Sequence, residues 1–534
     1  MLQSLSGFPK IGKEDKMDTK RIILSMVASL LLALTLASAG SAQDSMLTIA
    51  WAAVARSLDP AIATSATERQ QILLAYERLV RYDRQGNLKP HLAESWESSD
   101  DLKTYAFRLR KGIRFHDGTP LNAEAVKFSF ERTIKIGAGP AQYLRNVDRI
   151  EVPDEHTVVF KLKEPDVLFV SLAIATFHGN QIVSPKAVRD HATSDDPWAQ
   201  KWMGSHMVGT GPYKLVEFQP GTHTLFERNL DYWMGWSAKP IERVVIKPVR
   251  EYTTRKTMLL MKQADIISEV SPIDLETLDK TPGIHIKRIK TMYTNYFFFN
   301  HLFKPFQDKR VREALSSAFN YQAGIQIYKG TVTPLKGVIP DVFFGHDPSL
   351  PEGKRDLQKA KKLLSEAGVK PGELKIRFMY WTGTDERRRL AELFKSNMAD
   401  VGVDVTIIPR EWVQLKAEAF DPSRRPEVVH YETWPAVADP LVILETLFRK
   451  GGALDCSSYD NPRIVEIISQ LRSTGDSKKR AELSKEAQRI IYNDKPAIFL
   501  WTATYLDGVR DRVKGYEPYI TEGGYYDIRE MSLE

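Results

Sequence analysis

Three tryptophans, Trp381, Trp412 and Trp434, are the residues of this sequence best suited to binding chemistry. Each stands just past the end of a predicted strand. Large flat side chains in that position can stack on a ligand and exclude water from a cleft. A single tryptophan is more often core packing than a ligand contact, so both interpretations stay open. We predict that these three residues contact a ligand.

Signatures of reaction chemistry are absent from the sequence. It contains no metalloprotease, dithiol, nucleophile-elbow or phosphate-loop motif. The nearest match to a phosphate loop, residues 209–212, lacks the third glycine and is predicted to be a turn into a strand. The His116-Asp117-Gly118 segment is more simply a tight turn than a catalytic pair. We therefore predict no catalytic residue, no metal site and no cofactor, and an unrecognised hydrolase is the alternative.

Composition narrows the class of protein further. The 534 residues are 43% apolar and 27% charged, which is ordinary for a globular chain and excludes a disordered, collagen-like or disulfide-scaffold protein. The net charge of +7 is small, and acidic residues are interleaved with the basic ones, whereas nucleic-acid binders cluster their Lys and Arg. We expect no nucleic-acid partner. The single cysteine, Cys456, excludes an internal disulfide and is expected to be a buried or loop thiol.

The N-terminus has the features of a secretory signal peptide. Lys20 and Arg21 precede an apolar run over 22–37, which is followed by small residues. The run is shorter than the roughly 20 residues that span a bilayer. We predict cleavage after Ala42, or alternatively after Ala39, with residues 1–16 as an upstream extension. No cysteine lies near either point, so the prediction is a periplasmic protein that is not a lipoprotein; a buried N-terminal helix is the alternative.

The hydrophobic pattern differs between the two halves of the mature chain. In the first half, alternating residues predict strands over 47–53, 102–107 and 156–162, and Asn122 is a plausible N-cap for a helix over 123–133. In the second half, strands and helices alternate. The predicted helices cover 356–367, 386–400 and 412–420, and the predicted strands cover 374–380, 403–408 and 427–431. This alternation predicts a mostly parallel sheet with a ligand crevice at its strand ends, and hence an α/β protein of two lobes with a cleft between them.

A further block of residues resembles a known family. The segments that carry the resemblance are residues 93–97, 100–112, 115–132, 209–213, 231–233, 308–315 and 513–516. In this order they are similar to the family 5 extracellular solute-binding proteins, the dipeptide-, oligopeptide- and nickel-type receptors of ABC importers. The resemblance extends over essentially the whole mature chain, and the signal peptide agrees with it.

The resemblance implies a fold and a domain organisation. The expected fold is α/β, a two-lobed clamshell of the type II periplasmic-binding-protein kind with an extra inserted domain. Domain I would comprise residues 43–77, 205–288 and 503–534, domain II would be an insertion over 78–204, and domain III would be the ligand lobe over 289–502. Partners implied by the family are a small-molecule or short-peptide ligand and the importer permease, with the receptor a monomer.

The resemblance also implies a binding site. By position, the family's N-terminal cleft loop matches Thr64, Ser65, Ala66 and Thr67, and its domain III cleft positions match the three tryptophans. Peptide receptors carry an aspartate shortly after the equivalent of Trp434, which binds the peptide ammonium group. Here that stretch is one residue shorter, and Val437 or Ala436 falls at the aspartate position.

The missing carboxylate bears on the ligand class. Removing one partner of a buried charge pair costs about 2–5 kcal/mol, so another acid would have to replace it in a peptide receptor. Asp439 is a substitute if the loop shifts by one residue, although the family's structural Asp-Pro turn is the favoured explanation of this residue; Asp385 and Glu386 are further candidates. We expect a receptor for a peptide or peptide-like polar solute. The alternatives are a sugar conjugate or an opine as the ligand and, in another class, a periplasmic hydrolase or chaperone.

Overall fold

The structure is a computed structural model that describes residues 45–63, 65–176, 180–520 and 524–534. The predicted signal peptide, residues 1–42, and the predicted site residue Thr64 lie outside the described residues. No helix in the described ranges is both long enough and apolar enough to cross a membrane.

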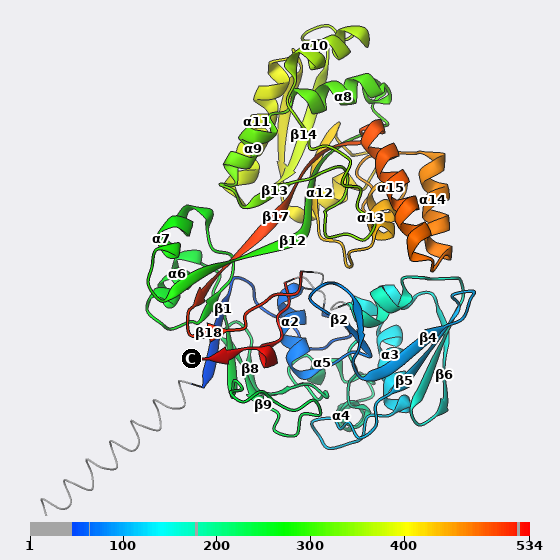
Figure 1. Cartoon of the computed structure of the whole chain (residues 1–534), viewed down its shortest axis with the longest axis vertical. Helices are drawn as coiled ribbons and strands as arrows, with labels where there is room; N and C mark the ends of the chain where they lie inside the picture. Colours follow the sequence, from blue (N-terminus) through cyan, green and yellow to red (C-terminus); the bar gives the residue numbers. More distant parts are fainter. Residues whose placement is uncertain (1–44, 64, 177–179, 521–523) are drawn as a thin grey trace, which may run out of the picture.

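Two long strands join an upper lobe to a lower one (Figure 1). They are β12 (Ile284–Phe299) and β17 (Ala497–Arg510), which pair antiparallel along most of their length. The pairing is interrupted between Lys290 and Thr294, where a bulge leaves residues of β12 unpaired. A bulge breaks the ladder and increases the local twist. The two lobes therefore meet at an irregular point of a shared pair of strands, which is suited to act as a hinge.

The upper lobe contains the strand–helix alternation that the sequence predicts. Its parallel strands are β14 (Lys375–Trp381), β15 (Asp404–Arg410) and β16 (Val428–Thr433), in the order β15-β14-β16. The remaining strands of this lobe are β12, β17 and β13 (Val332–Pro334), which are antiparallel to their neighbours. The prediction of a mostly parallel sheet thus holds for three strands. It fails for the rest because β12 and β17 enter from the other lobe.

Helices cover both faces of this sheet and enclose two apolar cores. They are α8 (Lys309–Ala318), α9 (Tyr321–Ile327), α10 (Leu357–Glu366), α11 (Asp385–Ala399), α12 (Trp412–Ala419), α13 (Pro440–Leu447), α14 (Pro462–Ser473) and α15 (Ser477–Asp494). Successive side chains of a strand point to opposite faces. Accordingly Phe297 belongs to one core and Phe298 to the other, and both are fully buried. The predicted helices and strands of this half agree with the structure to within two residues at their ends.

The lower lobe contains the other half of the shared sheet. Its strands are β1 (Met46–Trp51), β8 (Tyr213–Gln219), β9 (His223–Arg228), β10 (Arg243–Pro248) and β11 (Ile266–Ile267), in the order β11-β1-β10-β9-β8. The helices around it are α2 (Ala66–Ala75), α6 (Tyr252–Leu260) and α7 (Leu275–Asp279). The chain ends beside this sheet with a small hairpin, β18 (Val513–Lys514) and β19 (Ser532–Leu533). Domain I therefore contains segments from both ends of the chain.

A separate antiparallel sheet with its own core lies beside domain I in the lower lobe (Figure 1). Its strands are β4 (Ala93–Ser98), β5 (Thr104–Leu109), β6 (Val147–Asp154) and β7 (Thr157–Leu162), in the order β4-β5-β7-β6. Helix α3 (Ala123–Ile136) packs on it, and the predicted N-cap is confirmed because Ala125 N donates to Asn122 Oδ1 at 3.0 Å. The smaller elements are β2 (Val80–Tyr82), β3 (Leu88–Pro90), α4 (Pro185–His191) and α5 (Gln200–Met203).

The predicted limits of this inserted domain, 78–204, stay a prediction. Its apolar core draws on residues 79–182 and on Val437 of the upper lobe. Val188 and Met203, near the predicted end of the insertion, instead join the core of domain I. By core packing, the insertion therefore ends nearer residue 182 than residue 204.

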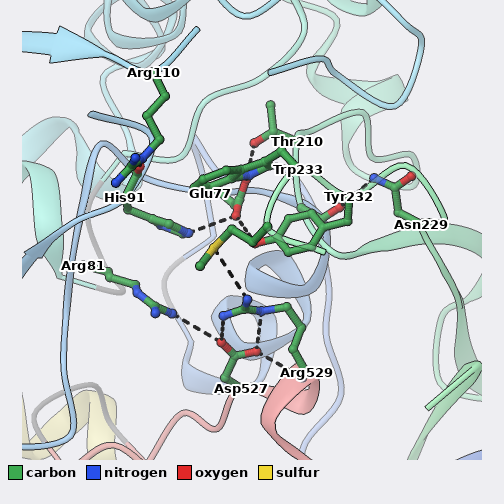
Figure 2. Close-up of polar contacts among 12 residues, drawn as sticks. Glu77, Arg81, His91, Arg110, Thr210, Asn229, Tyr232, Trp233, Asp527 and Arg529 are labelled. Carbon is green, nitrogen blue, oxygen red and sulfur yellow. Dashed lines mark hydrogen bonds and ion pairs between the residues drawn. The ribbon is translucent and has the colours of Figure 1, made fainter. Parts of the chain in front are cut away.

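Figure 2 shows a buried carboxylate, Glu77, whose partners come from domain I and, in the case of His91, from domain II. Glu77 accepts hydrogen bonds from the Thr210 hydroxyl (2.7 Å), the Tyr232 hydroxyl (2.6 Å) and the Trp233 indole (2.8 Å), and His91 Nε2 lies 2.9 Å away. We call these five residues the Glu77 network. Burial alone would raise the pKa of Glu77, but His91 and the hydrogen-bond donors outweigh burial and lower it to about 2. The carboxylate is therefore ionised and fully partnered at neutral pH.

The two motifs that could have suggested chemistry are structural. A Cβ atom on Gly209 or Gly211 would lie 2.0 or 2.6 Å from backbone atoms of Ala75, so this segment is a close backbone contact that leads into β8. The Asp117 carboxylate accepts from Thr119 N at 3.0 Å within a tight turn and also accepts from Ser184 Oγ. Both sequence interpretations, a turn into a strand and an Asp-Gly turn, are confirmed.

Candidate functional site

A cavity of about 480 Å³ lies between the two lobes, at the bulge of β12 and β17. Residues of both strands line it, including Tyr293 on β12 and Tyr505 on β17. Domain I contributes the end of β1, helix α2 and the loop after β11. Domain III contributes the start of α11 and the end of β16. A change in the angle between the lobes would therefore change the shape of this cavity.

The domain III wall is built around an ion pair. Arg387, in the first turn of α11, donates to both oxygens of Glu432 at 3.0 and 2.7 Å, and Tyr293 Oη donates to Glu432 Oε2 at 2.6 Å. Burial would raise the pKa of Glu432, but the Arg387 hydrogen bond and nearby positive charge outweigh it, and the pKa is lowered. Glu432 therefore remains ionised but has no free oxygen. It is a fixed part of the wall.

Glu386, the residue before Arg387, also lines the cavity. In the described part of the chain, no ion pair or side-chain hydrogen bond engages its carboxylate. It lies in the first turn of α11, where the helix dipole favours a negative charge. Glu386 is one of the candidate acids predicted from the sequence. The structure gives it a place on the cavity surface with its charge available.

The three predicted tryptophans lie behind this wall. The guanidinium carbon of Arg387 lies 3.9 Å from the ring centroid of Trp381, and Trp412 packs 4.9 Å from Trp381 and stacks on Tyr431. Trp434 packs against two residues that do line the cavity, Tyr293 and Tyr505, at centroid distances of 6.1 and 5.4 Å. None of the three tryptophans itself belongs to the cavity lining. In this structure they support the residues that do.

The domain I wall carries two further acids. Glu269, in the loop after β11, is exposed and has a left-handed backbone (φ 56°), which is strained for a residue other than glycine. Asp507, on β17, accepts from Tyr516 Oη at 2.6 Å. Burial, assisted by the charge of Glu269, raises the pKa of Asp507 to about 6, although the Tyr516 hydrogen bond opposes the shift.

The predicted cleft loop at the start of α2 is only partly in the cavity. Thr67 lines it, together with Gln70 one turn later. Ser65 is instead the N-cap of α2, where its hydroxyl accepts from Glu68 N at 3.2 Å in a capping box. Ala66 is the first residue of the helix, and Thr64 lies outside the described residues.

Val437 and Asp439, the other two predicted residues, are not part of the cavity lining. The Val437 side chain is 2% exposed and packs in the apolar core of domain II, and Thr176 Oγ1 donates to the neighbouring Ala436 O at 3.1 Å. Asp439 is the N-cap of α13, where its Oδ1 accepts from Leu441 N at 3.0 Å. Arg480 binds both of its carboxylate oxygens, at 2.8 and 2.7 Å. These contacts favour the Asp-Pro turn over the substitute-anchor hypothesis.

Most residues of the cavity wall were not predicted from the sequence. Glu432 had a visible signal, because it is a charged residue near the end of a buried, strand-forming run. Tyr505 and Asp507 alternate along one strand, but the analysis assigned no strand there. Glu269 had no signal, since its position depends on how the loop after β11 folds. Among the described residues, no group of three or more His, Cys, Asp or Glu side chains is arranged to hold a metal ion.

A comparison with protein families matches residues 87–455, more than half of the chain. The matching model describes bacterial extracellular solute-binding proteins, family 5 Middle. Among curated proteins, the chain is 28% identical over 482 residues to the probable D,D-dipeptide-binding periplasmic protein DdpA of Escherichia coli (strain K12). The match covers 88% of this chain and 91% of that protein.

Solved structures share the whole architecture. The structure of HbpA2 from Haemophilus parasuis superposes with a TM-score of 0.82 at 25% identity and covers 92% of this chain and 100% of its own. The Helicobacter pylori periplasmic binding protein DppA, in complex with the peptide STSA, superposes with a TM-score of 0.74 at 25% identity. That match covers 92% of this chain and 98% of DppA. The likeness therefore includes the two lobes and the strands that join them.

Proposed function

Because this chain belongs to family 5 of the bacterial extracellular solute-binding proteins, we propose that it is the periplasmic receptor of an ABC importer and captures a peptide or peptide-like polar solute by closing its lobes. The observation that carries the proposal is the cavity at the bulge of β12 and β17, whose walls come from both lobes. A solute bound there would contact more surface in the closed form than in the open form.

The mechanism is capture without reaction. A ligand favours closure only by the difference between its affinities for the closed and open forms. Contacts to domain III alone would not supply that difference, so residues of domain I such as Thr67 must also reach the ligand. Closure about the bulge would then bury the solute, as in other hinge-type binding proteins. The closed receptor would dock on the permease, which opens it and accepts the ligand.

The cavity contacts proposed here revise the predicted set of site residues. We assign direct contact to Thr67, Glu386 and Tyr505, which line the cavity. Trp434 supports Tyr505 from behind, Trp381 and Trp412 support Arg387, and Asp439 fixes the start of α13. The remaining parts of the proposal are export through the predicted signal peptide, a monomeric receptor and no catalytic activity.

A non-peptide ligand is the second candidate. It is favoured by the shortened stretch after Trp434, because the resemblance places Val437 or Ala436 where peptide receptors carry the ammonium-binding aspartate, and the Val437 side chain is buried in domain II. The receptor role would be unchanged, and the solute would be a sugar conjugate, an opine or another polar molecule.

The test is ligand-induced closure of the chain lacking its first 42 residues. A panel of free-amine di- and tripeptides, opines and sugar conjugates would be screened by thermal shift, and each hit would be measured by small-angle scattering. We expect at least one hit to reduce the radius of gyration. Tyr505→Ala should reduce the affinity for that ligand by about tenfold, because it removes an aromatic contact of about 1.4 kcal/mol.

The matched control is Val413→Ala, which truncates an exposed side chain on α12 and should leave affinity unchanged. A wild-type protein that binds none of the panel, or that binds without becoming more compact, would contradict the proposed receptor function. Release of a chemically altered solute would instead support the hydrolase alternative.

A further inference from the structure

The charged groups that line the cavity are unequally divided between acids and bases. Among the described residues they are the acids Glu269, Glu386, Glu432 and Asp507 and the base Arg387. Glu432 and Arg387 neutralise each other through two hydrogen bonds. This leaves Glu269, Glu386 and Asp507 as the surplus charge of the walls.

One more cation lies close to the domain I acids, behind the cavity surface. Arg255 is 2% exposed, and its positive charge acts on Glu269 and Asp507. Its guanidinium is bound by backbone oxygens, with Nη1 donating to Val249 O at 2.8 Å and Arg250 O at 2.7 Å and Nε donating to Ser268 O at 3.1 Å. Even with Arg255 included, the acids around the cavity outnumber the bases by two.

Aromatic side chains are a second, independent feature suited to a cation. The rings of Tyr293, Tyr505 and Trp434 pack mutually with centroid distances of 5.4 to 6.4 Å, and the two tyrosines line the cavity. The faces of aromatic rings attract a positive charge, most strongly when water is excluded. In addition, the Tyr328 hydroxyl, which also belongs to the lining, is buried without a hydrogen-bond partner. The wall therefore presents aromatic ring faces and an unused tyrosine hydroxyl to a ligand.

The two acids without a side-chain partner belong to different lobes. Glu386 is on α11 of domain III, and Glu269 is in the loop after β11 of domain I. In an empty receptor, two like charges that approach one another oppose closure. A cation placed between them converts that repulsion into two attractions. The arrangement would therefore make closure dependent on the charge of the solute.

We propose that the cavity selects solutes that carry a net positive charge and holds the cationic group between Glu386, Glu269 and the face of Tyr505. This inference rests on the proposed receptor function and names the ligand class of the same site. In place of the aspartate that the resemblance implies at Val437 or Ala436, it assigns acids from the two sides of the cleft. The positive charge becomes the part of the ligand that draws the lobes together.

The test uses two series of probes in which charge changes and size is nearly constant. The first is alanyl-alanine amide, alanyl-alanine and N-acetyl-alanyl-alanine, with charges of about +1, 0 and −1 near pH 7 from the ordinary pKa values of amines and carboxyls. The second is putrescine, 4-aminobutanoate and succinate, with charges of about +2, 0 and −2 on the same basis. Calorimetric titration should give the tightest binding for the most positive member of a series, by about tenfold or more over the neutral one, and no binding for the anion.

Variants then assign the selectivity to residues. Glu386→Gln and Glu269→Gln should each reduce the affinity for the cationic probe by about tenfold. The double variant should bind the cationic and the neutral probe with equal affinity. Glu392→Gln is the matched control, since Glu392 is on the same helix but is exposed and pairs with Arg388 at 2.6 Å. All variants should keep the wild-type melting temperature to within about 2 °C because these are exposed or half-buried side chains.

The outcomes separate this inference from the receptor proposal. A neutral or anionic probe that binds tightest, or a cationic probe whose affinity survives the double variant, would overturn the charge selectivity while leaving ligand-induced closure intact. Absence of binding by all six probes would also overturn it. Selective binding of putrescine alone would support it and would move the ligand from peptides to amines.

Discussion

Carboxylates at two junctions between domains differ in whether other side chains bind them. Glu77, at the junction of domains I and II, is 3% exposed and is surrounded by the four donors of the Glu77 network. Glu386 and Glu269, at the junction of domains I and III, line an open cavity and have no side-chain partner among the described residues. The first junction is therefore closed by its own side chains. At the second junction, the carboxylates of Glu386 and Glu269 are available to bind a ligand.

The difference bears on which junction the proposed closure would use. A buried charge is tolerated only when it is paired and hydrogen-bonded, and the satisfied network then fixes the parts that supply it. In the Glu77 network the contact with His91 is the one that links domain I to domain II. Domain III is connected to domain I by two strands with a bulge and a polar cavity, and a change in its angle would separate Val437 from the domain II core.

The strongest test of this comparison is Glu77→Ala. Removing a buried charge leaves the hydroxyls of Thr210 and Tyr232 and the indole of Trp233 without an acceptor. We expect a loss of about 3–5 kcal/mol in the free energy of unfolding, measured by denaturant titration. Glu94→Ala, an exposed residue of β4, should change it by less than about 0.5 kcal/mol.

The pH dependence of stability, compared between wild type and Glu77→Ala, tests whether the ionised form of Glu77 is the stabilising one. The folded-state pKa of Glu77 is about 2, below its ordinary value of 4.5. Its stabilising contribution is therefore present above pH 4.5 and is lost as the pH falls toward 2. The difference in stability between wild type and Glu77→Ala should shrink over this range. A difference that stays constant would show that the network does not act through the ionised carboxylate.

Asp439→Ala tests whether a third carboxylate is structural, like Glu77, or binds the ligand, as proposed for Glu386. Asp439 is partnered by Arg480 and caps α13, so it should behave like Glu77. We expect a loss of about 2 kcal/mol in unfolding free energy from the cap and the partly buried pair, with the affinity for alanyl-alanine amide unchanged. A loss of affinity of tenfold or more without a loss of stability would restore Asp439 as the ligand anchor.

The smallest expected change in stability concerns Asp507. This carboxylate lines the cavity, like Glu386, but accepts a hydrogen bond from Tyr516. Its folded-state pKa of about 6 lies above the ordinary 3.8, so its contribution to stability is greatest below pH 3.8 and is lost as the pH rises through 6. Asp507→Asn should therefore raise the melting temperature by about 1–2 °C at pH 7.5 and by less at pH 4. A variant less stable than wild type at pH 7.5 would show that the ionised carboxylate stabilises β17.

The sequence predicted the elements of domain III well because the pattern there is local. Gly368 ends one helix, Thr384 caps the next, and buried strand residues lie between them. The long strands β12 and β17 were not predicted, since each changes from one lobe to the other midway and neither has a single buried face. Their pairing depends on segments about 200 residues apart.

The candidate site was predicted less completely, for a related reason. The tryptophans were found because they follow local strands, but their rings are used as support for Arg387, Tyr293 and Tyr505. Asp439 was found by its position in a motif whose loop is shortened here. Glu269 and Asp507 come from another lobe, and only the folded arrangement brings them to the same cavity as Glu386.

Domain I contains contacts between segments near the two ends of the chain, and this arrangement affects the order of folding. Leu47 and Met531 belong to the same core, Arg512 Nη2 donates to Met46 O at 2.9 Å, and Asp527 pairs with Arg81 and Arg529 (Figure 2). A chain that emerges N-terminus first presents β1 more than 450 residues before these partners. Contacts so distant in sequence form slowly. Domains II and III, each built mainly from one continuous stretch, can fold earlier, so domain I is the last to be completed and the first to be lost if the C-terminus is shortened.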